Sequence, residues 1–252
     1  MTDTIQFNVR GSVAEITLNN PAKHNSLGKT ELDALAICLK AIANDAEFRV
    51  LVIRGAGDKT FCGGASLVDL RSGAITGDDF QAVTDLISSL KIPTVAALNG
   101  SVFGGGAELA LSCDFRIGCA GMILRVPPAT MGLCYPISGI CTFVRKLGPT
   151  LSKRLLLAAE KLEDGDLLSL GFLDHLVLPA EFELTVDRYA DQLAANAPLS
   201  VQGMKQIVDQ IMNGELDHKW AQAIADQCWN SADLQEGLAA QKDKRTPVFN
   251  GA

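Results

Sequence analysis

The chain has 252 residues, of which 48% are apolar, and it carries a net charge of −7. This composition supplies a full core for one large domain and is not that of a disordered chain. The 29 acidic residues outnumber the 22 basic ones, which argues against nucleic acid as the main partner because phosphate binding needs a basic face.

The cysteines, the histidines and the apolar runs argue against a disulfide-linked, metal-binding, secreted or membrane-spanning protein. The seven cysteines form no C-x-x-C pair and the three histidines stand singly, so neither a disulfide framework nor a metal site is expected. The start MTDTIQ is polar, unlike a secretory signal, and the apolar runs fall short of the roughly 20 residues of a membrane span. We therefore expect a cytoplasmic protein that contacts neither a membrane nor nucleic acid.

Strands and helices are predicted to alternate through the first half of the chain. Residues 4–9 and 12–18, with Gly11 between them, predict a hairpin. The further strands expected are 49–55, 93–100 and 114–119, and the helices expected are 28–45, 78–91 and 107–113. No long hydrophilic linker separates these elements, so the pattern favours an α/β arrangement in which loops follow buried strands.

After about residue 180 the pattern becomes purely helical. The expected helices are 183–199, 200–212, 215–230 and 233–244. Pro198 and Gly214 are expected to interrupt the helical pattern. We therefore divide the chain into a mixed core, residues 1–190, and a helical C-terminal region, residues 191–252. Such a helical region often packs on a neighbouring subunit.

Two glycine-containing turns stand where a predicted strand leads into a predicted helix. The first is DKTFCGGASLVDL, residues 58–70, and the second is SVFGGGAELAL, residues 101–111. The first N–H groups of a helix lack internal partners, and glycine lets a ligand approach them closely. An anionic oxygen suits such a place, and two converging N–H groups are what an oxyanion hole needs. A tight turn packed against a helix is the alternative explanation of either stretch.

Six stretches along nearly the whole chain resemble the crotonase (enoyl-CoA hydratase/isomerase) superfamily. They are LNNPAKHNSL, RVLVIRGAGDKTFCGGASL, IPTVAALNGSVFGGGAELALSCDFRIG, PATMGL, GFLDHLV and EGLAAQKDKRTPVFNG. The resemblance implies an α/β fold, a crotonase-like spiral of ββα turns with a helical C-terminal trimerisation region. It also implies an enzyme of acyl-CoA thioesters, assembled as a homotrimer or a dimer of trimers. No metal or redox cofactor is implied, because coenzyme A is part of the substrate.

The resemblance also assigns roles to residues by position. The backbone N–H groups of Ala65 and Gly105 would hold the thioester carbonyl and stabilise its enolate, and Glu108 would be an acid/base. The coenzyme A contacts that it implies are Ala22, Lys23, Asn25, Cys62, Gly63, Gly64, Ala65, Leu67, Lys242 and Lys244. The last two belong, with Arg245, to a basic C-terminal tail. The tail can come from a neighbouring subunit, and an ordinary solvated surface is the alternative for any single lysine.

The chain departs from the pattern of typical hydratases in its second acid. Those enzymes use two glutamates to hold the water that adds to the double bond. The first aligns with Glu108, but the position of the second, twenty residues later, is Pro128. The acid that commonly follows the oxyanion alanine is also replaced, by Ser66. Glu108 is therefore expected to be the sole carboxylate of the site.

Tyr135 is the other candidate for a catalytic role. It stands in PATMGLCYPISGI and is one of two tyrosines in the chain. The methylmalonyl-CoA decarboxylase branch of the superfamily carries a tyrosine in a similar context and lacks the second glutamate. That branch has a histidine at the position of Ala65, however. Packing at the pocket wall is the alternative role of Tyr135.

Three activities remain open from the sequence. The first is enoyl-CoA hydration or double-bond isomerisation with Glu108 as the sole carboxylate acid/base. The second is decarboxylation of a malonyl-type ester with the help of Tyr135. The third is a catalytically weak or silent acyl-CoA-binding homologue.

Overall fold

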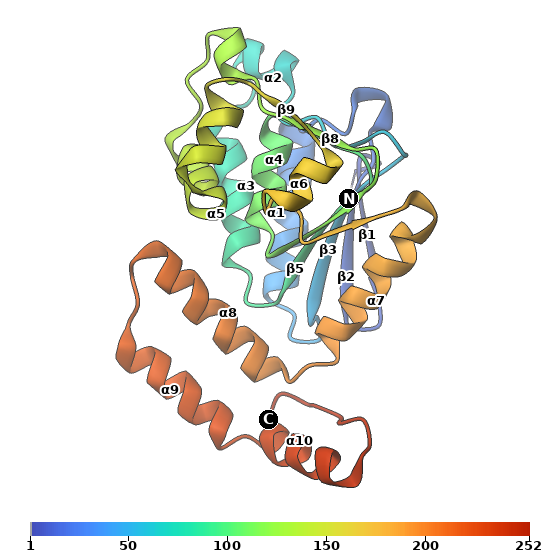
Figure 1. The fold of residues 1–252 in the computed structure, drawn as a ribbon, viewed down its shortest axis with the longest axis vertical. Coiled ribbons are helices and arrows are strands. Elements are labelled where there is room, and N and C mark those ends of the chain that lie inside the picture. Colours follow the sequence, from blue (N-terminus) through green and yellow to red (C-terminus); the bar gives the residue numbers. More distant parts are fainter. Residues whose placement is uncertain (1) are drawn as a thin grey trace.

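The computed structural model describes residues 2–252, which form two sheets surrounded by helices (Figure 1). The strands are β1 (Ile5–Arg10), β2 (Val13–Leu18), β3 (Val50–Gly55), β4 (Thr60–Cys62), β5 (Thr94–Leu98), β6 (Ser101–Phe103), β7 (Phe115–Cys119), β8 (Ile123–Arg125), β9 (Lys161–Glu163) and β10 (His175–Val177). The α-helices are α1 (Lys29–Ala43), α2 (Leu67–Ser72), α3 (Gly77–Ser89), α4 (Gly105–Ser112), α5 (Ile137–Leu156), α6 (Asp164–Ser169), α7 (Phe182–Ala194), α8 (Pro198–Asn213), α9 (His218–Trp229) and α10 (Ala232–Asp243). Three short 3-10 helices are η1 (Pro21–Lys23), η2 (Pro128–Met131) and η3 (Pro179–Glu181).

The elements repeat as a ββα spiral. One sheet has the order β1-β2-β3-β5-β7-β10 and the other the order β4-β6-β8-β9. Each of the three central turns gives one strand to the first sheet, the next strand to the second sheet, and then one or two helices. These turns are β3–β4–α2–α3, β5–β6–α4 and β7–β8–α5. The predicted hairpin is the antiparallel pair β1–β2, and the predicted spiral is confirmed.

Both faces of the large sheet are buried, which explains the continuous apolar runs of its central strands. Leu51 and Ile53 of β3 point to the main core, together with residues of α1, α3, α4 and α5. Val50 and Val52 point the other way, to a smaller cluster under α7. Because side chains alternate along a strand, this double burial requires apolar residues at all four successive positions from Val50 to Ile53.

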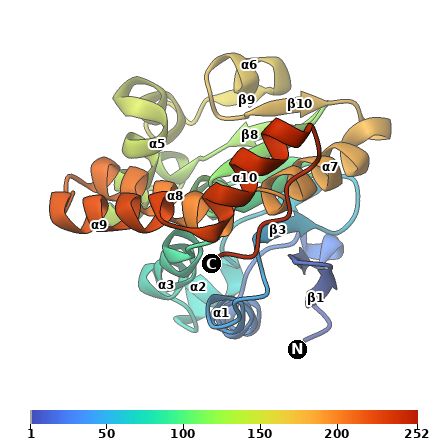
Figure 2. The same ribbon diagram turned by 90° about the horizontal axis from the view of Figure 1, so that it is seen from below.

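The chain leaves the sheet after α7 rather than at the predicted boundary. Phe182, Val186 and Ala190 of α7 are buried against the sheet, whereas α8–α10 extend away from the core as an arm (Figures 1 and 2). The boundary predicted between 190 and 191 is therefore misplaced, since it cuts a helix that belongs to the core. The break falls at residues 195–197, between α7 and α8.

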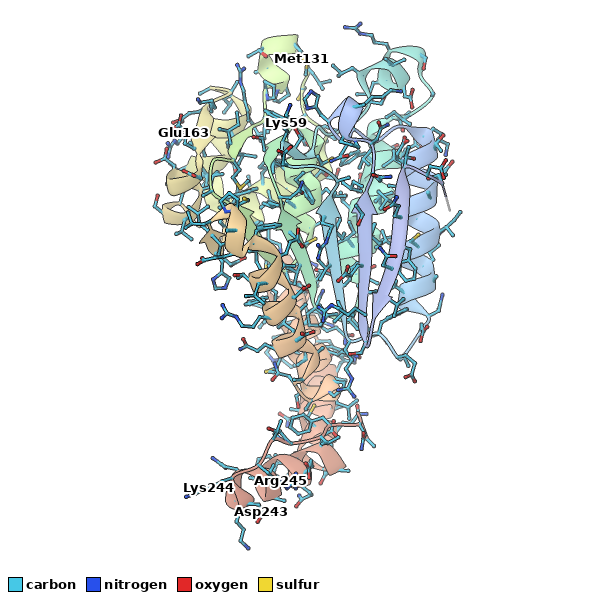
Figure 3. The ribbon with its side chains drawn as sticks, turned by 90° about the vertical axis from the view of Figure 1, so that its right-hand side faces the viewer. Lys59, Met131, Glu163, Asp243, Lys244 and Arg245 are labelled. Atoms are coloured by element: carbon cyan, nitrogen blue, oxygen red, sulfur yellow. The ribbon has the colours of Figure 1, made fainter. Side chains whose placement is uncertain are left out.

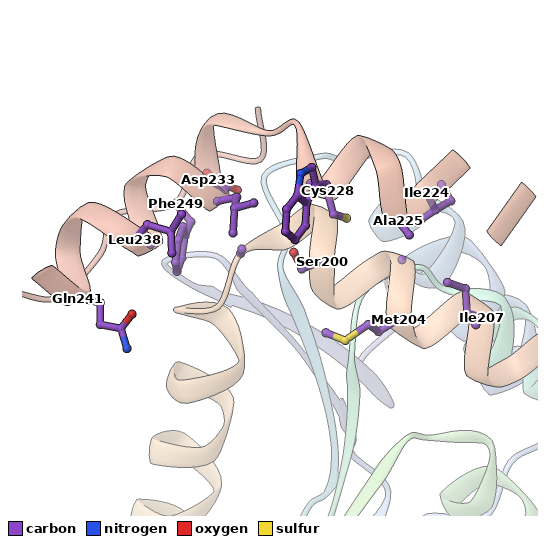
Figure 4. A pocket seen from close by; sticks show the side chains of 15 residues that line it. Ser200, Met204, Ile207, Ile224, Ala225, Cys228, Asp233, Leu238, Gln241 and Phe249 are labelled. Atoms are coloured by element: carbon purple, nitrogen blue, oxygen red, sulfur yellow. The ribbon is translucent and has the colours of Figure 1, made fainter. Parts of the chain in front are cut away.

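The arm carries a large apolar surface. Met204, Trp229 and Leu238 are more than half exposed, with Trp229 at 74%. They line a cavity of about 490 Å³ between α8, α9 and α10, together with Ile207, Ile224 and Phe249 (Figure 4). None of the helices in residues 2–252 is long and apolar enough to cross a membrane.

Candidate active site

The two glycine turns run side by side, as the sequence predicted. A methyl group placed on Gly64 would lie 2.6 Å from the backbone nitrogen of Gly105, and one on Gly106 would lie 2.4 Å from the carbonyl oxygen of Cys62. Gly64 also has a φ of +85°, which other residues rarely adopt. Glycine is therefore required at these places because the two backbones touch.

Two backbone N–H groups at these turns are left without a partner. The bonds Leu27 N–H to Gly64 O and Ser66 N–H to Leu27 O, both 2.8 Å, hold the first turn on either side of Ala65. Within residues 2–252, neither the Ala65 N–H nor the Gly105 N–H donates a hydrogen bond. Gly105 begins α4, where the helix dipole is positive. Both N–H groups are thus available to an oxygen atom from a ligand.

Ala65 and Gly105 line a cavity of about 300 Å³ in the core. The other residues that line it are Gly63, Leu67, Leu70, Thr76, Gly77, Phe80, Phe103, Gly104, Glu108, Pro127, Pro128, Met131, Leu133, Tyr135 and Pro136. The cavity of the arm is larger, but this smaller one contains the glycine turns and the buried carboxylate. It is therefore the candidate active site.

Buried Glu108 and half-buried Tyr135 form a hydrogen-bonded pair in this cavity. The Tyr135 hydroxyl donates a 2.8 Å hydrogen bond to Oε2 of Glu108, which is 4% exposed. Burial raises the pKa of Glu108, although the bond from Tyr135 opposes this shift and nearby Asp85 adds to it. Burial and the adjacent Glu108 raise the pKa of Tyr135 well above its ordinary value. Tyr135 therefore stays protonated at neutral pH and acts as a hydrogen-bond donor.

Two neighbours hold this pair in place. The Tyr135 ring packs edge-on against buried Phe143, with ring centroids 5.7 Å apart. Gly139 of α5 provides the room, since a methyl group there would lie 2.3 Å from Cε1 of Tyr135 and 2.8 Å from Oε2 of Glu108. The sequence analysis assigned no role to Gly139, although this glycine stands in the stretch PATMGLCYPISGI that carries Tyr135.

The second acid of typical hydratases is absent from the cavity. Pro128 is buried in η2 and lines the cavity at the expected position. Among the described lining residues, Glu108 is the sole carboxylate. The Ser66 hydroxyl accepts the N–H of Asp69 at 3.3 Å and caps α2, so it has a structural role.

Two of the predicted coenzyme A contacts have buried side chains. Asn25 donates to the carbonyl oxygens of Ala56 and Thr60, and its own side-chain oxygen accepts the N–H of Asn20. The Cys62 thiol accepts the N–H of Gly64 at 3.3 Å, and burial raises its pKa to about 12. The side chains of both residues are therefore occupied within the protein, and a contact of either residue with coenzyme A stays a prediction that falls to its backbone.

Three further predicted contacts, Ala22, Lys23 and Leu67, are exposed. Ala22 and Lys23 are exposed in η1, and the loop after η1 reaches the first glycine turn because the Gly63 N–H donates to His24 O at 2.7 Å. Leu67, 53% exposed, lies where α2 meets the mouth of the cavity.

The basic tail lies far from the cavity of its own chain. Lys242 and Lys244 belong to the end of α10, and Figure 3 shows Lys244 and Arg245 at the opposite end of the molecule from Met131, which lines the cavity. The chain by itself therefore does not bring Lys242 and Lys244 to the site. In residues 2–252, no group of three or more His, Cys, Asp or Glu side chains could hold a metal ion.

Comparison with known proteins agrees with this geometry. The family model described as enoyl-CoA hydratase/isomerase matches residues 8–252. The chain belongs to the enoyl-CoA hydratase/isomerase family. It is 30% identical to the crotonyl-CoA hydratase of Syntrophomonas wolfei, over 94% of both chains. It is 28% identical to the short-chain-enoyl-CoA hydratase of Clostridium acetobutylicum, over 93% of both.

A solved structure of this family superimposes closely. The enoyl-CoA hydratase/carnithine racemase of Magnetospirillum magneticum has a TM-score of 0.95 and is 25% identical, covering 100% of this chain and 97% of that one. The chain is therefore an enzyme of the enoyl-CoA hydratase/isomerase family, with the crotonase fold that the sequence predicted.

Proposed function

We propose that this enzyme moves the double bond of an acyl-CoA thioester, converting a 3-enoyl-CoA into the conjugated 2-enoyl-CoA. The observation that carries this proposal is a single buried carboxylate, held by a phenol, beside two unpartnered N–H groups in one apolar cavity. Isomerisation needs one base that moves a proton between two carbons, whereas hydration needs a second group to hold water.

The first part of the proposed mechanism is an oxyanion hole. The N–H groups of Ala65 and Gly105 would bind the thioester oxygen and stabilise the negative charge that it gains in the enolate. Removal of one such donor typically costs about 3–4 kcal/mol of transition-state stabilisation. The support is that both N–H groups lack acceptors among residues 2–252 and line the same cavity.

The second part is a proton transfer by Glu108. Its carboxylate takes a proton from carbon 2, and the electron pair of the broken C–H bond passes into a dienolate whose charge rests on the thioester oxygen. The protonated Glu108 then gives this proton to carbon 4, and the pair returns as the double bond between carbons 2 and 3. The raised pKa of Glu108 brings the carboxyl closer to working pH, where a general base and its conjugate acid are both useful.

Tyr135 supports this transfer as a donor to Glu108. Its hydrogen bond selects one orientation of the carboxylate and favours the ionised form, which is the form that removes a proton. The phenol keeps its own proton because its pKa is raised. We therefore place Tyr135 beside the reacting atoms, with Glu108 as the sole acid/base.

Two other reactions fit the cavity less well. Hydration would lack the positioned group that Pro128 replaces, and the loss of such a group slows a reaction by about 10²–10⁴-fold. Decarboxylation of a malonyl-type ester would put a substrate carboxylate beside Glu108 in an apolar cavity, and two like charges there oppose each other's ionisation.

A parallel assay of three substrates tests the proposal. The wild-type enzyme and a Glu108→Gln variant are incubated with 3-hexenoyl-CoA, crotonyl-CoA and methylmalonyl-CoA. We expect rapid isomerisation of the first by the wild type, slow or no hydration of the second, and loss of isomerisation in the variant. Isomerisation that survives the substitution would refute Glu108 as the base, and carbon dioxide release as the fastest reaction would favour the decarboxylase.

We further propose that the arm assembles this chain into a homotrimer or a dimer of trimers. The apolar surface around Trp229 is the support, since large exposed apolar patches mark interfaces. In such an assembly Lys242 and Lys244 would reach the coenzyme A phosphates at a neighbouring subunit. Light scattering on the wild type and on Trp229→Asp tests this, and a monomeric wild type would contradict it.

A further inference from the structure

A phenylalanine ring presses on the second glycine turn from within the cavity. Phe80 of α3 is 6% exposed and lines the 300 Å³ cavity with Gly105. A methyl group placed on Gly105 would lie 2.7 Å from Cζ of Phe80 and 3.1 Å from both of its Cε atoms. The far edge of the ring thus occupies the space that a side chain at position 105 would take.

The start of α3 fixes the position of this ring. The Thr76 hydroxyl accepts the N–H of Asp79 at 3.3 Å, and the Asp79 carboxylate accepts the N–H of Thr76 at 2.8 Å. This capping box orders the first turn of α3, immediately before Phe80. Val83 and Ile87, from the following turns, are buried in the main core. The ring therefore has a fixed helix behind it and cannot easily withdraw.

The remaining walls of the cavity are uncharged. Apart from Glu108 and Tyr135, the described lining residues carry no ionisable side chain. Leu67 and Met131 line the cavity and are 53% and 56% exposed, so an apolar chain that fills the cavity can leave it between α2 and η2. A charged acyl group would lose water here without gaining a partner of opposite charge.

We propose that Phe80 restricts this enzyme to acyl-CoA substrates whose acyl chain is uncharged and unbranched at carbon 2. This inference rests on the proposed function, because carbon 2 lies beside Gly105 when the Gly105 N–H holds the thioester oxygen. Carbon 2 is bonded to the carbonyl carbon, so a methyl group on it meets the edge of Phe80. A linear chain passes the ring and continues toward Leu67 and Met131.

The kinetic test compares 3-hexenoyl-CoA with 2-methyl-3-hexenoyl-CoA on the full chain. The kcat/KM of the wild type should be roughly 10- to 200-fold higher for the linear substrate than for the branched one. This is the usual effect of one additional methyl group on the kcat/KM of a substrate in an apolar pocket. Phe80→Leu and Phe80→Ala should each reduce this preference by about tenfold. Val83→Ala, which weakens the packing of the same helix without lining the cavity, should leave the preference unchanged.

A binding test separates this specificity from the reaction itself. Calorimetry measures the affinity of each protein for hexanoyl-CoA and 2-methylhexanoyl-CoA, which contain no double bond. If no isomerisation occurs but the wild type favours the linear ester and Phe80→Leu does not, Phe80 sets specificity and the proposed reaction fails. Equal affinities of the wild type for both esters, or an unchanged preference in both Phe80 variants, would overturn the role of Phe80.

Discussion

Replacement of Gly139 with alanine tests the carboxylate–phenol pair without altering either of its members. A methyl group at this position would lie 2.3 Å from Cε1 of Tyr135 and 2.8 Å from Oε2 of Glu108, whereas ordinary contact begins near 3.4 Å. The Tyr135 ring must therefore move by about 1 Å in a densely packed interior. Such a movement breaks the 2.8 Å bond between the hydroxyl and Glu108.

The expected loss follows from this broken bond. A hydrogen bond to a charged group contributes about 1.5–3 kcal/mol, which corresponds to a fall in kcat/KM of about 10- to 150-fold. The helix α5 itself is not weakened, because alanine is favoured over glycine in a helix by about 1 kcal/mol. The effect should therefore appear in catalysis and not as a failure of α5 to form.

The assay follows conjugation of 3-hexenoyl-CoA by ultraviolet absorbance across a range of pH. Gly165→Ala is the matched control, because the same methyl group at that position in α6 meets nothing within 4 Å. The control should keep wild-type kinetics. A Gly139→Ala enzyme that retains both the wild-type kcat/KM and the wild-type pH profile would refute the role of this pair in organising the site.

Three further substitutions address the other parts of the site. Gly105→Ala drives a methyl group into the Phe80 ring and should lower kcat/KM by about 10²–10³-fold with an unchanged circular dichroism spectrum, because it displaces the Gly105 N–H; full activity would contradict the tight contact of Phe80 with this turn. Tyr135→Phe removes the bond that lowers the pKa of Glu108, so the rising limb of the pH–rate profile should move to higher pH by about 1–2 pH units, and an unmoved limb would contradict this. Glu108→Gln should raise the free energy of unfolding. Because the folded-state pKa of Glu108 is raised, ionisation opposes folding, and stability is lost as pH rises through that pKa. The gain should be about 1.4 kcal/mol for each pH unit that separates the folded-state pKa from the unfolded-state pKa. It should appear in denaturant titrations above the folded-state pKa and vanish below the unfolded-state pKa; a gain independent of pH would argue against ionised Glu108.

Much of the fold could be predicted from periodicity. Strands β3, β5 and β7 and helices α1, α3 and α7–α10 occur close to their expected places, because each is long enough to show an apolar pattern. The strands β4, β6, β8 and β9 went unpredicted, since three residues are too few to reveal an alternation. The predicted domain boundary was misplaced for a similar reason. Both α7 and α8 are amphipathic, and an amphipathic pattern does not show whether the apolar face of a helix packs on the sheet or elsewhere.

The site could be predicted in part. The glycine turns and Glu108 stand out locally, but the 2.8 Å bond from Tyr135 joins residues 27 positions apart and depends on where α5 begins. Asn25 and Cys62 belong to stretches that resemble the family pattern, but the sequence does not display that both side chains are buried. The position of Lys242 depends on the direction of the arm, which no local pattern specifies.

Transfer of an isotopic label tests most directly whether Glu108 alone carries the proton between two carbons. 3-Hexenoyl-CoA with deuterium at carbon 2 is isomerised in ordinary water, and the product is analysed by NMR for deuterium at carbon 4. We expect part of the label to reach carbon 4 in the wild type, and we expect Glu108→Gln to form no product. A product with only solvent hydrogen at carbon 4, formed also by Glu108→Gln, would contradict this role of Glu108.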